Sequence, residues 1–97
     1  MKKGYWVVAY RSISDEAALK AYAALAAPAV EAAGGRNLTR STSAVTAYEA
    51  GMPIRTIVVE FESYEKALAA HESEAYQKAL KVLGSAAERD YRIVEGG

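Results

Sequence analysis

The chain has 97 residues, with twelve basic and twelve acidic side chains, a formal net charge of zero and no cysteine. This length corresponds to a single domain over residues 1–97. The balanced charge, without a basic block, argues against nucleic acid and anionic membranes as partners, and the absence of cysteine excludes disulfides, thiolate catalysis and cysteine-ligated zinc.

The sequence also lacks the marks of export or membrane insertion. No apolar run approaches the roughly 18 residues of a membrane span, and residues 1–30 lack the charged-then-apolar layout of a secretion signal. We therefore expect a cytoplasmic protein. Although 52% of the residues are hydrophobic, 21 of them are alanine, so the core should be small, and a thin core in a short chain favours oligomerisation.

The N-terminal half is predicted to form a strand, a helix and a strand. Residues 5–12 are rich in aromatic and β-branched side chains, which is typical of a strand. Ser14 is the expected N-cap of a helix that ends at Gly34-Gly35, and Pro28 should bend this helix or divide it in two. Residues 36–49 are expected to form a long second strand with a bulge in its middle.

The C-terminal half is predicted to form a strand, a helical region and a strand. A turn at residues 50–53 leads to a third strand over residues 54–62, Ser63 and Ser73 are expected to cap two short helices, and residues 91–95 form a last strand. The order of elements is that of the ferredoxin-like βαββαβ fold of the α+β class, a four-stranded antiparallel sheet with its helices on one face.

The first and third predicted strands are apolar on both faces. Residues 5–10 and 57–59 contain almost no polar side chain, and the helices can cover only one face of the sheet. A second copy of the chain is the expected cover for the other face, so the sequence predicts a homodimer.

Several segments, in order and spacing, resemble a known family. They are Gly4-Tyr5-Trp6, Pro28 followed by residues 34–40, residues 59–64, residues 73–77 and residues 94–96. Together they are similar to domain-of-unknown-function family 1330, in the dimeric α/β barrel superfamily. The resemblance implies a ferredoxin-like protomer whose sheet packs on that of a second protomer. It implies no established reaction, since the family is uncharacterised and the wider superfamily includes cofactor-free oxygenases and haem-handling proteins.

A candidate site follows from side-chain alternation along the strands. We assign Ile57, Val59 and Phe61 to the helix-facing side, because they form the more uniformly apolar set, and this places Glu60 on the opposite face. A hairpin centred near residue 50 would bring Arg40 opposite Glu60, on the face that a dimer buries, with Trp6 and Tyr10 nearby. One interpretation is that Arg40 holds an anion or carboxylate while Glu60 orients it or moves a proton. The alternative is an ion pair that fixes the register and the dimer.

His71 is the only histidine, and we expect it late in a short helix, where a contact with the helix dipole is its commonest role. A lone histidine without cysteine cannot build a typical metal site, so neither a metal nor a cofactor is expected. Tyr22 and Tyr76 are expected to be core residues with a hydrated hydroxyl.

The sequence therefore predicts a homodimer that binds a small acidic or partly apolar molecule, with Arg40, Glu60, Trp6, Tyr10 and His71 as candidate ligand-binding residues. It leaves open whether the protein is a cofactor-free enzyme. The alternative is a structural or interaction dimer with neither ligand nor catalytic activity.

Overall fold

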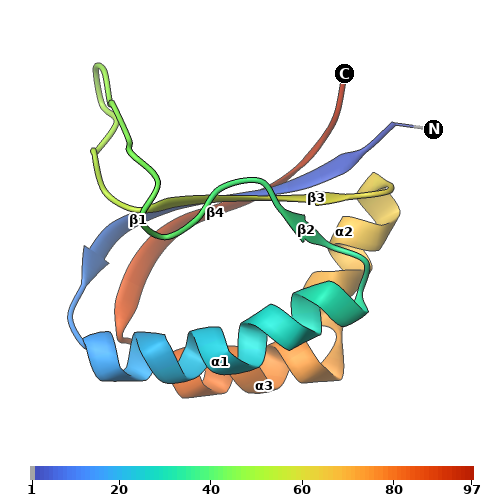
Figure 1. Cartoon of the computed structure of the whole chain (residues 1–97), viewed down its shortest axis with the longest axis horizontal. Coiled ribbons are helices and arrows are strands. Elements are labelled where there is room, and N and C mark those ends of the chain that lie inside the picture. Colours follow the sequence, from blue (N-terminus) through green and yellow to red (C-terminus); the bar gives the residue numbers. More distant parts are fainter. Residues whose placement is uncertain (1) are drawn as a thin grey trace.

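The computed structural model describes residues 2–97 and contains one four-stranded antiparallel sheet with helices along one of its faces (Figure 1). The elements are β1 (Gly4–Ile13), α1 (Glu16–Ala32), β2 (Arg36–Asn37), β3 (Thr56–Phe61), α2 (Tyr64–Glu72), α3 (Glu74–Leu83) and β4 (Ala87–Glu95). The strand order is β2-β3-β1-β4. This confirms the ferredoxin-like arrangement, in which α1 and α3 lie side by side against the sheet and α2 lies at one end of it.

The register of the sheet decides which side of β1 faces the helices. Trp6 lies opposite Val59 and Val8 lies opposite Ile57, and residues directly opposed in a sheet share a face. Because Val59 faces the helices as expected, Trp6, Val8 and Tyr10 also face them and are 2%, 3% and 4% exposed. The prediction that Trp6 and Tyr10 lie on the open face, away from the helices, is therefore wrong. The side chains of β1 on the open face are Tyr5, Val7 and Ala9.

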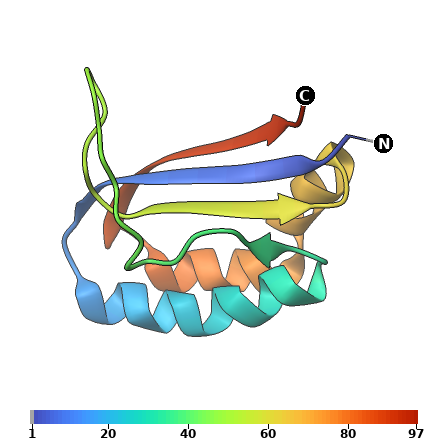
Figure 2. The same cartoon turned by 45° about the horizontal axis from the view of Figure 1, so that its top comes forward.

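The expected long second strand is also wrong, because within residues 2–97 the ladder of β2 with β3 is limited to Arg36 and Asn37. One further backbone bond follows, from the Leu38 amide to the Val58 carbonyl at 2.8 Å. Residues 38–55, the 38–55 loop, leave the sheet. The first part of the loop runs along the edge of the sheet beside β3, and the later part rises past the sheet on the side away from the helices (Figures 1 and 2). At its start the Thr39 hydroxyl accepts from the Val58 amide at 3.0 Å and donates to the Thr56 carbonyl at 2.9 Å. A threonine side chain thus takes the place of ladder bonds, as Ser and Thr side chains often do.

The helix N-caps follow the sequence except at α1. Asp15, rather than Ser14, caps α1 by accepting from the Ala18 amide at 3.0 Å, while the Ser14 hydroxyl donates to the Ala86 carbonyl, just before β4, at 3.1 Å. Ser63 and Ser73 cap α2 and α3 as expected.

Pro28 lies inside α1, which is one continuous helix, so the alternative of two separate pieces is wrong. In Figure 1 the C-terminal part of α1 is inclined toward the sheet, as expected for a helix that bends where a proline removes a backbone donor. Gly34 ends the region with a φ of 86°, and the Gly35 amide donates to the Val30 carbonyl at 2.9 Å. Neither α1 nor any other helix within residues 2–97 is long and apolar enough to cross a membrane.

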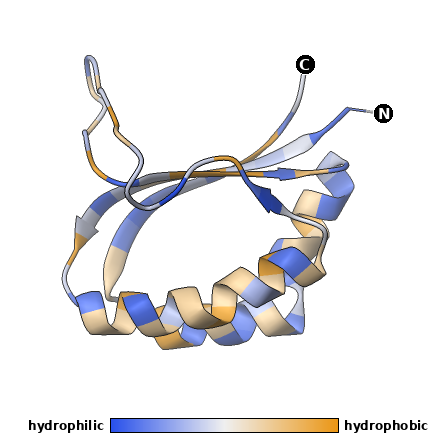
Figure 3. Cartoon of the chain, viewed as in Figure 1, coloured by the Kyte–Doolittle hydropathy of each residue, from blue (hydrophilic) through white to orange (hydrophobic). Residues whose placement is uncertain are grey.

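Alanine shapes the layer between the sheet and the helices. Figure 3 shows α1 mostly in the pale orange of alanine, with few charged positions. Ala67 and Ala79 are fully buried, which allows α2 and α3 to approach the sheet closely. Aromatic side chains fill the remaining core, and the Trp6 indole donates to the Ala67 carbonyl at 2.8 Å. The part of this layer between the sheet and α1 is less completely filled.

Candidate functional site

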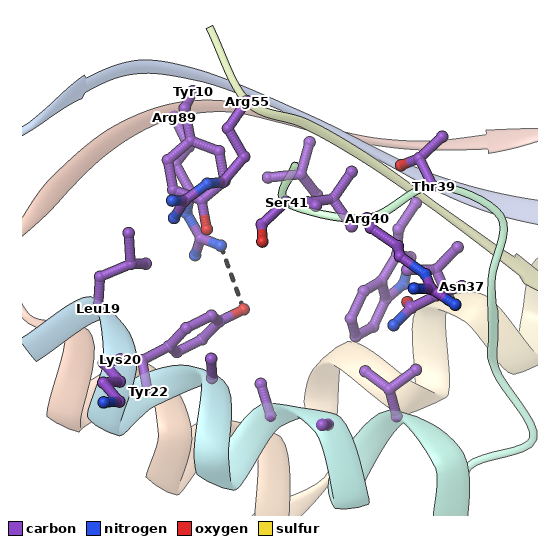
Figure 4. A pocket seen from close by; sticks show the side chains of 18 of the residues that line it. Tyr10, Leu19, Lys20, Tyr22, Asn37, Thr39, Arg40, Ser41, Arg55 and Arg89 are labelled. Atoms are coloured by element: carbon purple, nitrogen blue, oxygen red, sulfur yellow. Dashed lines mark hydrogen bonds between the residues drawn. The ribbon is translucent and has the colours of Figure 1, made fainter. Parts of the chain in front are cut away.

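A cavity of about 590 Å³ lies between the sheet and α1, beside the start of the 38–55 loop (Figure 4). Side chains from all four strands, from α1 and α3 and from the loop line it. The helix contributes three small side chains, Ala23, Ala26 and Ala27, and this leaves the space open. The volume falls within the range of about 300–1,000 Å³ that small-molecule sites occupy.

One end of the cavity carries a row of polar side chains across three adjacent chain segments. Tyr10 on β1 lies opposite Arg89 on β4, and the Tyr10 amide donates to the carbonyl of Arg55, just before β3, at 3.0 Å. Farther along the same strands the lining is apolar, with Val8 and Ile57 next to this row. The sheet side of the cavity is therefore polar at this end and hydrophobic in its middle.

The Arg89 guanidinium is held by tyrosine rings. Its central carbon lies 5.1 Å from the ring centroids of Tyr22 and Tyr91 and 5.6 Å from that of Tyr10. These distances are typical of cation–π contacts. One of its nitrogens, Nη1, also donates to the Tyr22 hydroxyl at 3.2 Å, so both the position and the orientation of the guanidinium are fixed.

Arg55 brings a second positive charge to the same ring. Its guanidinium carbon lies 5.6 Å from the Tyr10 centroid, and neither Arg55 nor Arg89 forms an ion pair with any carboxylate of residues 2–97. Two like charges beside one ring repel each other, and an anion between or beside them would offset this repulsion. This end of the cavity is therefore suited to an anionic group.

Phenol hydroxyls complete this end. The Tyr22 and Tyr76 hydroxyl oxygens are 2.7 Å apart. Burial, with a further contribution from Tyr76, raises the pKa of Tyr22, and burial also raises the pKa of Tyr10 against the opposing effect of Arg89. Both phenols therefore stay protonated at neutral pH. Because Tyr22 accepts from Arg89, its own proton can go to Tyr76 or to a ligand oxygen.

The charged side chains around the cavity are mostly basic. Among residues 2–97, the charged residues of the lining are Lys20, Arg40, Arg55 and Arg89 and one carboxylate, Glu16, so four positive charges and one negative charge leave an excess of three. Although the whole chain is neutral, its charges are distributed so that the cavity attracts anions.

The model of the family described as a domain of unknown function (DUF1330) matches residues 3–97. The chain belongs to the DUF1330 family. No curated protein matches it significantly. The family assignment confirms the resemblance seen in the sequence and leaves the activity of this DUF1330 domain to be argued from its site.

Solved structures share the fold at low sequence identity. A protein of unknown function from Rhodopseudomonas palustris is 16% identical, with a TM-score of 0.69 over 97% of this chain and 80% of that chain. A putative antibiotic biosynthesis monooxygenase from Nitrosomonas europaea is 16% identical, with a TM-score of 0.55 over 100% and 97%. An ethyl tert-butyl ether d (EthD) family protein from Bacillus halodurans is 11% identical, with a TM-score of 0.58 over 100% of both chains. These likenesses confirm the ferredoxin-like fold of the protomer.

Three of the five residues proposed from the sequence line the cavity of this DUF1330 domain, namely Trp6, Tyr10 and Arg40. The predicted pair of Arg40 with Glu60 does not form. Glu60 lies opposite Arg36 in the sheet, and Arg36 Nη2 is 3.1 Å from Glu60 Oε1. The prediction assumed a hairpin paired up to its turn, whereas the 38–55 loop leaves the sheet early and moves the partner of Glu60 by four residues.

His71 lies outside the cavity lining. Its Nδ1 is 2.8 Å from Glu72 Oε2, and its ring packs edge-on against Tyr91 at 5.3 Å between centroids. Within residues 2–97, no group of three or more histidine, aspartate or glutamate side chains is placed to hold a metal ion.

Sequence reasoning missed Arg55 and Arg89. The last strand was expected to begin at Tyr91, but it begins at Ala87, and this brings Arg89 into the sheet opposite Tyr10. A signal was present, because alternation extended backward from Tyr91 and Ile93 would place Arg89 on the same face.

Proposed function

We propose that this protein binds a small organic anion with an apolar body in the cavity between the sheet and α1. The main observation in support is that the guanidinium groups of Arg55 and Arg89 both lie against the Tyr10 ring and have no carboxylate partner in residues 2–97. The acidic group of the ligand would lie at these guanidinium groups and accept from the Tyr22 hydroxyl. Its apolar body would lie against Val8 and Ile57.

The energetics of a half-buried arginine support this assignment. Tyrosine rings offset only part of the cost of removing a guanidinium from water. A carboxylate would supply charge-assisted, often bidentate hydrogen bonds, which are among the strongest that arginine makes. Nη1 of Arg89 is already engaged with Tyr22, and its remaining N–H groups are available for such a ligand.

A calorimetric titration with benzoate, phenylacetate and hexanoate tests the proposal. We expect at least one of them to bind, and Ala23→Leu to abolish that binding, because Ala23 is exposed and lines the cavity. Leucine has a high helix propensity, so α1 should remain folded. Ala24→Leu is the matched control, since Ala24 is exposed on the same helix and is not part of the lining. Failure of all three acids to bind, or equal binding by both variants, would contradict the proposal.

We further propose that two copies of the chain pair through their open sheet faces. Tyr5, Val7 and Ala9 on β1 and Val58 on β3 are half-buried there, although no helix within residues 2–97 covers this side of the sheet (Figure 2). A second copy would bury these side chains, and a stable interface of this kind covers at least about 1,200 Å² in total.

Val7→Asp should convert the dimer into a monomer, because it places an unpaired carboxylate at the centre of the interface. Sedimentation equilibrium of both forms at micromolar concentration measures this. Val82→Asp is the control, since Val82 lies on the outer surface of α3 with 40% of its surface exposed. A wild-type chain that sediments as a monomer would refute the proposed dimer.

A further inference from the structure

We propose that the cavity selects ligands with an acidic group at each end of an apolar body, so that it prefers a dicarboxylate to a monocarboxylate of the same length. This inference rests on the proposed function and names the ligand class more closely. It follows from the positions of Arg89 and Arg40 at opposite ends of the cavity.

The sheet register sets the distance between the two ends. Arg55 marks one end, and Asn37, which lies opposite Val59, marks the other. Arg55 and Val59 are four residues apart, which corresponds to about 13 Å along a strand. In Figure 4, Arg55 and Arg89 lie on one side of the cavity, and Arg40 lies beside Asn37 on the other.

Hydrogen bonds to Ser43 fix the backbone of Arg40, and its guanidinium is not used in an ion pair within residues 2–97. Its amide donates to the Ser43 hydroxyl at 2.8 Å, and its carbonyl accepts from the Ser43 amide at 3.0 Å. Its guanidinium makes no ion pair with any carboxylate of residues 2–97. The partner expected for it, Glu60, is bound by Arg36. Arg40 is therefore available to a ligand in the cavity that it lines.

The lining between the two ends is hydrophobic. Val8, Ile57 and Val59 cover the sheet side, and on α1 the alanines and Val30 face them. Burying a polar group there without a partner would cost free energy. A ligand that is charged at both ends and apolar between them matches this pattern. A monoacid would gain no contact with Arg40 and Asn37, which are exposed and would stay hydrated.

Calorimetry with four matched pairs tests the inference: butyrate and succinate, hexanoate and adipate, octanoate and suberate, decanoate and sebacate. We expect at least one diacid to bind the wild type about tenfold or more tightly than its monoacid. Arg40→Gln should remove this difference, because it weakens the binding of the diacid about tenfold or more and that of the monoacid much less. Arg36→Gln is the matched control, because it removes the same charge from a residue that lies outside the lining and contacts Glu60. That variant should keep the preference of the wild type.

The outcomes separate this inference from the proposed function. Monoacids that bind as tightly as diacids at every length would overturn the inference and leave the proposed function standing. An equal loss of preference in Arg40→Gln and Arg36→Gln would also overturn it, since overall charge would then be the cause. If no acid of either kind binds, both the inference and the proposed function are wrong.

Discussion

Arg89→Met should weaken the binding of small carboxylates by about a hundredfold while the protein remains folded. Truncating one partner of a buried charge pair costs about 2–5 kcal/mol, and a hundredfold loss corresponds to about 2.7 kcal/mol. Methionine retains an apolar stem that can pack on the tyrosine rings now contacted by the arginine. Calorimetry gives the change in Kd, and a thermal melt of each variant verifies the fold.

Two variants make this result interpretable. Arg92→Met removes the same charge from β4, but Arg92 is exposed and makes two hydrogen bonds to Asp90, at 3.0 and 3.2 Å, so it should leave the affinity unchanged. Arg89→Lys keeps the charge without the planar fork and should give an intermediate loss. Equal effects of Arg89→Met and Arg92→Met would indicate long-range electrostatics and would remove Arg89 from its proposed role.

The fold could be predicted because several independent signals agreed. The helix stop at Gly34-Gly35, the caps at Ser63 and Ser73, and the apolar strands around Val8 and Val59 all favoured the same order of elements. Local propensity and side-chain periodicity carry this information without any knowledge of long-range contacts.

The orientation of β1 could not be predicted from alternation alone. Both sets of its side chains are apolar, so periodicity separates Trp6 and Tyr10 from Val7 without showing which set meets the helices. The register with β3 decides this, because Trp6 lies opposite Val59. Alternation divides the side chains of a strand between two faces, and only the pairing with a neighbouring strand shows which face meets the helices.

The site was only partly predictable for a related reason. Arg40 was identified as an anion-binding candidate and does line the cavity, but its expected partner Glu60 depended on a hairpin that the chain does not form. Arg89 escaped notice because the start of the last strand was placed four residues late. Strand ends are set by tertiary pairing more than by local sequence, so the residues near them are the hardest to place.

Replacing Tyr76 should separate the packing of the core from its hydrogen bonding. Tyr76 is 1% exposed, its ring centroid is 4.8 Å from that of Trp6, and its hydroxyl oxygen is 2.7 Å from that of Tyr22. Tyr76→Ala should lower the free energy of unfolding by about 3–5 kcal/mol, the usual cost of deleting a buried aromatic ring. Tyr76→Phe keeps the ring and should cost only about 0.5–1.5 kcal/mol for the lost hydrogen bond.

Urea denaturation of the two variants measures both costs, with Tyr48→Ala as a surface control because Tyr48 is 80% exposed. Its effect should stay within about 0.5 kcal/mol. Tyr76→Phe should still bind small carboxylates, because Arg89 continues to donate to Tyr22 and to position it. If Tyr76→Phe destabilises the protein as much as Tyr76→Ala does, the hydroxyl network rather than ring packing holds this part of the core together.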